Sequence, residues 1–241
     1  MSWVVIVPVK GNPGAKTRLG ERPDRAGLAD AFALDTVAAL LAARSIDRVL
    51  VVTGDGELAG RLAALGADIV PEASVPAAAA GVDAAALHRP VRPSDPLNAA
   101  IRLGLAVARA EFPRANLAVM TGDLPALTPA DVERTLHLAA AHERSMVPDA
   151  AGTGTTTLLA RAGIPIEPRF GVGSRADHEA AGHVPLGLAA SVSIRHDVDT
   201  TADLAVAQRL GLGVHTRLLV DGAPGAVARQ RWNRRFSGDA G

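Results

Sequence analysis

The chain has 241 residues, of which 48% are hydrophobic but only 2% aromatic, and 25 basic and 25 acidic side chains give it a formal net charge of zero. This length suits one large α/β domain with a core of Ala, Val, Leu and Ile. The balanced charge argues against a general nucleic-acid binder, and the absence of cysteine excludes disulfides and thiolate sites. No apolar run is long enough for a signal peptide or a membrane span, so we expect a soluble cytoplasmic protein without a membrane partner.

Apolar runs alternate with helical periodicities along the chain as far as Asp149. The expected strands cover residues 3–9, 49–53, 68–71, 117–120 and 145–147, and the expected helices cover 25–44, 57–65 and 96–111. A further helix begins after Thr128, where Pro129 and Asp131 supply a first-turn proline and acid. This alternation predicts a largely parallel sheet with right-handed crossovers.

Beyond Asp149 the sequence changes to loops rich in glycine. Gly152–Leu159 is a glycine-threonine loop entering a strand, and Phe170–Ser174 is a second glycine-rich loop. We expect another strand at 191–195 and a closing helix at 201–210. The remainder has no apolar period, so we expect a catalytic domain over residues 1–220 and a flexible tail over 221–241.

One acid directly follows the apolar run at 117–120. Thr121 and Gly122 end the expected strand and leave Asp123 at its carboxyl end, the edge of an open α/β sheet where ligands bind. A carboxylate at that edge suits a Mg2+ ligand facing a phosphate-bearing substrate. The alternative is that Asp123 only caps a turn.

Two more acids, Asp197 and Asp199, follow the expected strand at 191–195. Side chains at i and i+2 of an extended chain point the same way, so both could share one metal site with Asp123. A metal ion there could bridge the α-phosphate of a nucleotide and the attacking oxygen. The alternative is turn chemistry, and we assign only Asp203 to it, as the acid of a capping box at Thr200.

Three cations, Lys10, Lys16 and Arg18, lie in the loop after the first expected strand. Gly11 and Gly14 remove side-chain bulk there, so backbone N–H groups could approach phosphate oxygens. Lys16 and Arg18 could hold a triphosphate and stabilise departing pyrophosphate. The loop has neither Walker A spacing nor the Gly-x-Gly-x-x-Gly pattern, and the alternative is a solvated basic loop.

The two glycine-rich loops offer hydroxyl groups and bare amides through Thr156, Gly171 and Ser174. Such groups suit a small anionic acceptor such as a phosphorylated carboxylate, although isolated loops of this kind are more often plain turns. His178 and His183 follow without a third ligand at metal spacing, and we interpret both as structural.

The order of these motifs resembles one family, the guanylyltransferases of coenzyme F-420 biosynthesis. The similarity covers residues 3–215, and its most specific parts are the Ala-Lys-Thr-Arg-Leu and Phe-Gly-Val-Gly-Ser segments. The motifs are, in order, Val7-Pro8-Val9-Lys10, Ala15-Lys16-Thr17-Arg18-Leu19, Gly122-Asp123-Leu124-Pro125, Gly154-Thr155-Thr156, Phe170-Gly171-Val172-Gly173-Ser174 and Asp197-Val198-Asp199-Thr200.

The resemblance implies an α/β fold of the single-domain GT-A-like Rossmann nucleotidyltransferase type, with a mostly parallel central sheet and helices on both faces. It also implies transfer of GMP from GTP to phosphoenolpyruvate or 2-phospho-L-lactate, giving enolpyruvoyl-2-diphospho-5'-guanosine or lactyl-2-diphospho-5'-guanosine and pyrophosphate. One departure from the family pattern is Pro96, where a glycine is expected before Leu97-Asn98. The implied site residues are Thr156, Gly171 and Ser174 for the acceptor, Asp123, Asp197 and Asp199 for Mg2+, Lys10, Lys16, Arg18 and Asn98 for the nucleotide, and Lys16, Arg18 and Asp123 for catalysis.

Two other functions remain open. A molybdenum-cofactor guanylyltransferase would share the fold, but it would begin with a Gly-Gly-x-Ser/Ala-x-Arg-Met type of loop that this chain lacks. A non-catalytic nucleotide-binding regulator would be expected to have lost Asp123 or Asp199, and this chain has both. The sequence does not decide between the two acceptors, and it leaves a homodimer open.

Overall fold

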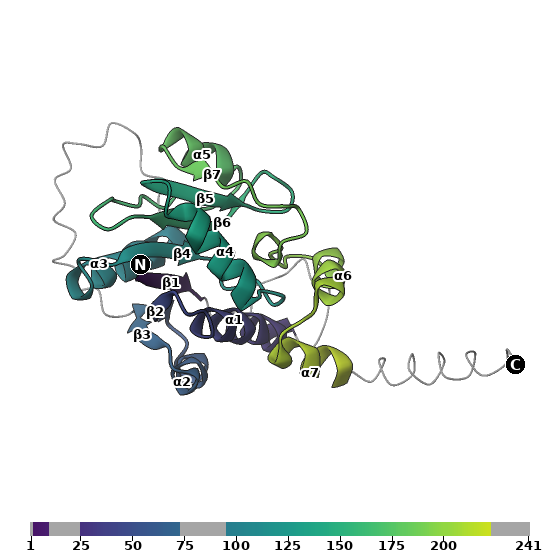
Figure 1. Ribbon diagram of the computed structural model, residues 1–241. Coiled ribbons are helices and arrows are strands. Elements are labelled where there is room, and N and C mark those ends of the chain that lie inside the picture. Colours follow the sequence, from purple (N-terminus) through teal and green to yellow (C-terminus); the bar gives the residue numbers. More distant parts are fainter. Residues whose placement is uncertain (1, 10–24, 73–94, 223–241) are drawn as a thin grey trace, which may run out of the picture.

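The computed structural model describes residues 2–9, 25–72 and 95–222, which form one seven-stranded sheet in the order β3-β2-β1-β4-β6-β5-β7 (Figure 1). Four of the six strand pairings are parallel, and the pairings of β6 with β4 and with β5 are antiparallel. The strands are β1 Trp3–Pro8, β2 Ile46–Thr53, β3 Asp68–Pro71, β4 Asn116–Met120, β5 Arg144–Pro148, β6 Thr155–Ala160 and β7 Val184–Pro185.

The reversed direction of β6 follows from its connection to β5. A short turn joins the two strands, and Asp149 closes it by accepting hydrogen bonds from the backbone N–H groups of Thr153 (2.9 Å) and Gly154 (2.8 Å). A turn of this length can join only antiparallel neighbours, because a parallel crossover needs a dozen or more residues. The expected α/β fold with a mostly parallel sheet is therefore confirmed, with a hairpin at β5–β6.

Most helices begin at a side-chain cap. Asp55, Asp95, Thr128 and Thr200 each accept a hydrogen bond from first-turn amides, and Thr200 forms the expected capping box with Asp203. The helices are α1 Arg25–Leu41, α2 Gly56–Leu65, α3 Pro96–Glu111, α4 Pro129–Ala139, α5 Ser174–Ala180, α6 Thr201–Leu210 and α7 Val214–Gly222.

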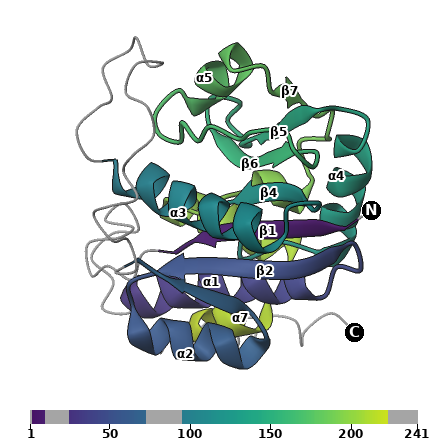
Figure 2. The ribbon, with the colours of Figure 1, turned by 90° about the vertical axis from the view of Figure 1, so that its left-hand side faces the viewer.

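Helices cover both faces of the sheet, as Figure 2 shows for α3 in front of it and α1 behind β2. Successive residues of a strand point to opposite faces. On one face Val5 and Val7 of β1 join a core with α1, α2 and α4. On the other face Val4 and Ile6 join a core with α3.

A third apolar cluster joins α1 to the last two helices. Leu28 and Phe32 of α1 pack with Leu204 and Ala207 of α6, and Val220 of α7 lies against this cluster. The carboxylate of Asp35, buried in α1, accepts hydrogen bonds from the first backbone amides of α7. Helix α7 was not expected from the sequence, and it continues past Val220 to Gly222.

The expected strand at 191–195 is wrong. The segment contains a short 3-10 helix, Ser193–Arg195. Val192 and Ile194 are buried, as their alternation with polar residues indicated, but the backbone does not pair with the sheet. The Asp131 carboxylate accepts the N–H of Ser193 instead, at 3.0 Å, so side chains replace a neighbouring strand as partners of this backbone.

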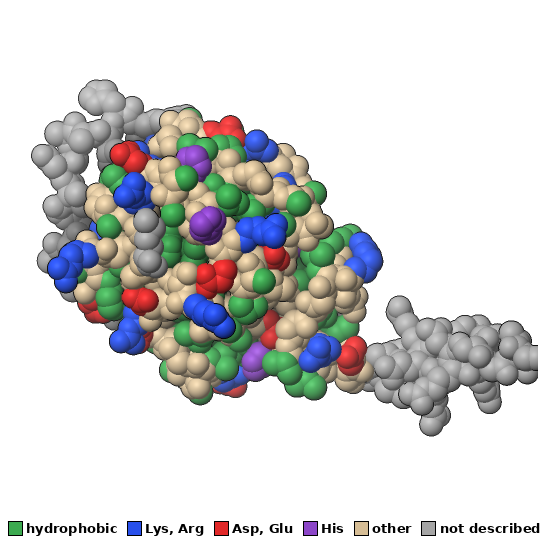
Figure 3. Space-filling model, viewed as in Figure 1, with side chains coloured by type: hydrophobic (Ala, Val, Ile, Leu, Met, Phe, Trp, Pro, Cys, Tyr) green, Lys and Arg blue, Asp and Glu red, His purple; other side chains and the backbone are tan. Residues whose placement is uncertain are grey.

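The expected nucleotide loop with Lys10, Lys16 and Arg18 lies outside the described residues, as do residues 73–94 and the tail from residue 223. On the face seen in Figure 3, acidic and basic side chains are interspersed. No helix within the described ranges has the length and hydrophobicity needed to cross a bilayer.

Candidate active site

The strand order places the ends of β1 and β4 together at the point where the chain changes direction across the sheet. From β1 the sheet grows through β2 and β3 on one side and through β4 on the other. Ligands of open α/β sheets bind at such a switch point, beyond the carboxyl ends of the strands. Asp123 follows β4 at this edge, and the chain from Val9 enters the expected nucleotide loop beside it.

Gly122 lets the two strand ends approach each other. A Cβ atom built on Gly122 would lie 3.1 Å from Val9 Cγ2 and 3.4 Å from the Pro8 carbonyl oxygen. The former is closer than most side-chain carbons come to a neighbour. A larger residue in front of Asp123 would therefore require the Val9 side chain to shift by a few tenths of an ångström.

The turn that carries Asp123 is fixed on both sides. The N–H of Leu124 donates to the buried Thr36 hydroxyl at 3.0 Å, and this hydroxyl donates to the Phe32 carbonyl one turn earlier in α1. The carbonyl of Asp123 accepts the N–H of Val198 at 3.0 Å. This last bond attaches the Asp123 turn directly to the segment between the other two acids.

The segment with Asp197 and Asp199 is anchored before and after the acids. Before them, the Thr156 hydroxyl donates to the Ile194 carbonyl at 2.7 Å. The Arg195 guanidinium donates to the carbonyl oxygens of Pro148, Leu188 and Asp149 at 2.9–3.2 Å. After them, the Asp203 carboxylate accepts the N–H of Thr200 in the capping box and also the N–H of Asp199. The expected division between Asp203 as a cap and the other two acids as cluster members agrees with these contacts.

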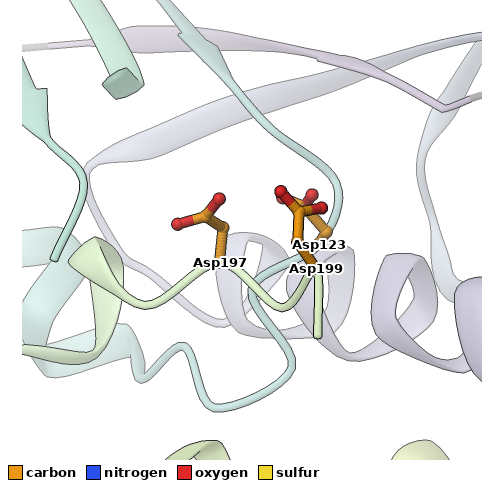
Figure 4. Close-up of side chains that lie close together, drawn as sticks. All are labelled: Asp123, Asp197 and Asp199. Atoms are coloured by element: carbon orange, nitrogen blue, oxygen red, sulfur yellow. The ribbon is translucent and has the colours of Figure 1, made fainter. Parts of the chain in front are cut away.

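The side chains of Asp123, Asp197 and Asp199 meet in one cluster (Figure 4). Each offers a carboxylate oxygen, and these three oxygens lie within 4.8 Å of one another. Asp123 and Asp197 are half-buried, whereas Asp199 is exposed. Carboxylate oxygens are the ligands that hard divalent cations prefer, so this acidic triad could hold a metal ion.

The three carboxylates of the triad repel one another when all are ionised and no cation is bound. Burial and, after it, the negative charges of Asp123, Asp199 and Asp149 together raise the pKa of Asp197 to about 7. A proton or a metal ion removes this repulsion, so the two compete for the site. The donor set therefore fits a divalent cation in chemistry as well as in spacing.

Thr156 lies close to the triad but uses its hydroxyl within the protein. It is buried in β6, where its carbonyl accepts the N–H of Thr121, two residues before Asp123. Its hydroxyl donates to the Ile194 carbonyl, which leaves an oxygen lone pair for other contacts. Through these contacts Thr156 joins β4 and β6 to the segment that carries Asp197 and Asp199.

The two glycine-rich loops lie next to each other. The N–H of Arg175 donates to the Thr153 carbonyl at 3.2 Å, and its guanidinium donates to the Gly152 carbonyl at 3.1 Å. Gly171 and Gly173 have positive φ angles of 139° and 74°, which favour glycine. Ser174, the first residue of α5, is buried at the end of this loop.

Asn98 contacts the same loop. Its side-chain Nδ2 donates to the Phe170 carbonyl and its Oδ1 accepts the Phe170 N–H, both at 2.9 Å. Nδ2 also donates to the Asp95 carboxylate, so both amide hydrogens are used within the protein. No local sequence pattern signals this pairing, because the two residues are 72 positions apart.

No protein-family model matches the chain. A phosphoenolpyruvate guanylyltransferase from Streptomyces scabiei is 45% identical over 230 residues, covering 92% of this chain and 100% of the relative. The proteins of the same name from Streptomyces coelicolor and Thermomonospora curvata are 44% and 42% identical, covering 92% and 93% of this chain and 100% and 91% of the relatives.

Solved structures show the same fold at lower sequence identity. A 4-diphosphocytidyl-2C-methyl-D-erythritol synthase matches with a TM-score of 0.52 and 13% identity, and a nucleotidyl transferase from Methanothermobacter matches with a TM-score of 0.51 and 17% identity. Each match covers 87% of this chain and 97% of the solved one. Because relatives 42–45% identical align over nearly the whole of both chains, this protein belongs to the phosphoenolpyruvate guanylyltransferase family.

Proposed function

We propose that this protein transfers GMP from GTP to phosphoenolpyruvate and releases pyrophosphate. The observation that carries the proposal is the meeting of Asp123, Asp197 and Asp199 at the switch point of the sheet. We choose phosphoenolpyruvate over 2-phospho-L-lactate because the relatives are named for it.

The reaction is an in-line displacement at the α-phosphorus of GTP. A phosphate oxygen of the acceptor forms the new P–O bond, and the bond to the β-phosphate oxygen breaks, so its electron pair leaves with pyrophosphate. The acceptor phosphate is already ionised at neutral pH, so no nucleophile or general base from the protein is needed. Positioning and charge neutralisation then accelerate the reaction, and one well-placed contact lowers the activation free energy by roughly 2.7–4 kcal/mol.

We assign Mg2+ to Asp123, Asp197 and Asp199, which fit it by donor type and spacing. When bound, this ion supplies positive charge against the phosphates. The chain itself holds the three acids in place through the Asp123–Val198 backbone bond and the Asp203 cap.

The remaining assignments concern the two substrates. We assign Thr156, Gly171 and Ser174 to the acceptor, because the two glycine-rich loops contact each other and Thr156 is bonded to Thr121 and Ile194, close in sequence to the three acids. We assign Lys10, Lys16 and Arg18 to the GTP phosphates, since their loop starts where β1 ends beside Gly122. The Asn98 amide group donates to Phe170 and Asp95, and its Oδ1 accepts the Phe170 N–H, so the second lone pair of Oδ1 is what could still accept a bond from ribose or guanine.

The direct test is a steady-state assay of the purified protein. GTP is incubated with Mg2+ and either phosphoenolpyruvate or 2-phospho-L-lactate, and pyrophosphate release is measured. We expect release with phosphoenolpyruvate and loss of release when EDTA removes the metal. Absence of turnover with phosphoenolpyruvate, or turnover with 2-phospho-L-lactate alone, would contradict the proposal.

A further inference from the structure

A buried histidine, His178, contacts every segment that we assign to the acceptor. It lies on α5 one turn after Ser174, and its side chain is fully buried. Its Nδ1 is 3.0 Å from the hydroxyl of Thr155, the residue before Thr156. Its Nε2 accepts the N–H of Arg169 at 3.0 Å, two residues before Gly171.

These contacts fix the tautomer of the ring. A backbone N–H can only donate, so Nε2 must be the unprotonated nitrogen, and the proton of the neutral ring is on Nδ1, from which it donates to Thr155. Burial is the main cause that lowers the pKa of His178 to about 4, and the nearby His183 and Arg169 contribute in the same direction against the opposing charge of Asp177. The neutral ring that the hydrogen bonds require is therefore the form present at neutral pH.

The backbone just before Gly171 is held at three points. His178 holds the N–H of Arg169, and Asn98 holds both the N–H and the carbonyl of Phe170. The Phe170 ring also packs edge-on against the His178 ring, with 5.1 Å between centroids. Val172, by contrast, is fully exposed at the tip of the loop. The loop thus projects from a base that the His178 imidazole and the Asn98 amide fix together.

We propose that His178 is a positioning residue that sets the geometry of the acceptor site by holding the Arg169 N–H, and with it the base of the Gly171 loop, against the start of α5. The inference rests on the proposed acceptor role of Thr156, Gly171 and Ser174. Among the described residues, His178 hydrogen-bonds neither Asn98 nor the three acids, so its loss should affect the use of phosphoenolpyruvate selectively.

Two conservative variants separate the two contacts of the ring. In His178→Gln the side-chain oxygen can reach the place of Nε2 and accept the Arg169 N–H, whereas the contact with Thr155 is lost. In His178→Asn the amide nitrogen replaces Nδ1 and donates to Thr155, but nothing accepts the Arg169 N–H. We expect KM for phosphoenolpyruvate to rise about tenfold or more in His178→Asn and to stay within about twofold in His178→Gln, with KM for GTP unchanged in both.

His183 provides a matched control. It is equally buried, and its ring packs edge-on against that of His178 with 5.9 Å between centroids. However, its Nδ1 bonds the Ser145 carbonyl on β5 and not the acceptor loop. His183→Asn should therefore lower the melting temperature without changing KM for phosphoenolpyruvate.

Hydrogen exchange gives a readout that needs no catalysis. We expect the Arg169 amide to be protected in the parent protein and in His178→Gln, and to exchange faster in His178→Asn. Equal KM values for phosphoenolpyruvate in both variants and the parent would overturn the positioning role, and so would an equal rise in His183→Asn. If the parent itself does not use phosphoenolpyruvate, the proposed function fails. The exchange pattern still tests whether His178 holds the Arg169 amide.

Discussion

At the scale of single residues, four neighbouring acids have two different roles. Asp123, Asp197 and Asp199 converge in the triad, whereas Asp203 caps α6. Asp123→Asn keeps the shape of the side chain but removes a charge that would bind Mg2+, so we expect at least a ~10²-fold loss of pyrophosphate release in a folded protein.

The matched control for Asp123→Asn is Asp203→Asn. Its amide oxygen can still accept the Thr200 N–H, so we expect most activity to remain and about 1 kcal/mol of stability at most to be lost. Melting curves establish that both variants fold. A folded Asp123→Asn protein with nearly normal turnover would refute the metal assignment.

Ser174 tests the acceptor loop at the same scale. Its hydroxyl is buried at the end of the glycine-rich loop, and Ser174→Ala would remove one donor to a charged ligand, worth about 1.5–3 kcal/mol. This corresponds to roughly ten- to hundredfold weaker use of phosphoenolpyruvate. Kinetics with each substrate varied in turn would measure it. A loss of apparent affinity for GTP instead would assign the loop to the nucleotide.

The lowered pKa of His178 also leads us to expect that the stability of the protein depends on pH. Its pKa is about 4 in the folded chain against 6.5 ordinarily, so between these values the unfolded chain takes up a proton that the folded chain excludes. The contribution of the neutral His178 ring to the free energy of unfolding is therefore complete above about pH 6.5, and it is lost as the pH falls towards 4. By urea denaturation, the stability difference between the parent and His178→Gln should shrink by roughly 2.5 kcal/mol from about pH 7 to about pH 4.5. A constant difference would show that the ring does not stay neutral.

At the scale of elements, α7 depends on a cap from another helix. The Asp35 carboxylate in α1 accepts the backbone N–H groups of His215 and Thr216 at 2.9 and 2.8 Å. Asp35→Ala leaves these amides without their acceptor, so we expect a loss of about 1–2 kcal/mol in chemical denaturation. Asp30, on the same helix, pairs with Arg61 near the surface, and Asp30→Asn should cost less than about 1 kcal/mol. Equal losses in the two variants would disprove the capping role.

The elements also show how far the sequence predicts this fold. Helices with local signals were predicted to the residue, as α3 and α6 show, because their caps and periodicity lie within the segment itself. The segment 191–195 was misassigned because its alternation resembles a strand, while its actual partners, Asp131 and Thr156, are far away in sequence. The short helices α5 and α7 were missed, and the cap of α7 is 180 residues distant.

The candidate site likewise has residues that the sequence predicts and residues that it does not. Asp123 was identified from its place after a strand, and Asp197 and Asp199 from their spacing after a segment wrongly expected to be one; the structure brings all three together. The residues that hold the site in shape, such as Arg195, Asn98 and His178, make contacts 7 to 72 positions away in sequence. No local pattern marks such contacts, so only the folded chain reveals them.

At the scale of the whole molecule, α7 is the last element that the structure describes. Val220 already packs against the third apolar cluster, and α7 ends two residues later. We therefore expect a chain truncated after Gly222 to keep the melting temperature and turnover of the full chain. A clear loss of either in the truncated chain would give residues 223–241 a structural or catalytic role.

The central claim is that an oxygen of the acceptor phosphate forms the new bond to the α-phosphorus of the nucleotide at this sheet edge. Phosphoenolpyruvate labelled with oxygen-18 on its phosphate, incubated with unlabelled GTP and the protein, tests this claim by mass spectrometry of the products. Direct attack by the acceptor predicts that all label stays in the guanosine adduct and that the pyrophosphate is unlabelled. Label in the pyrophosphate, or the absence of a labelled adduct, would contradict the account.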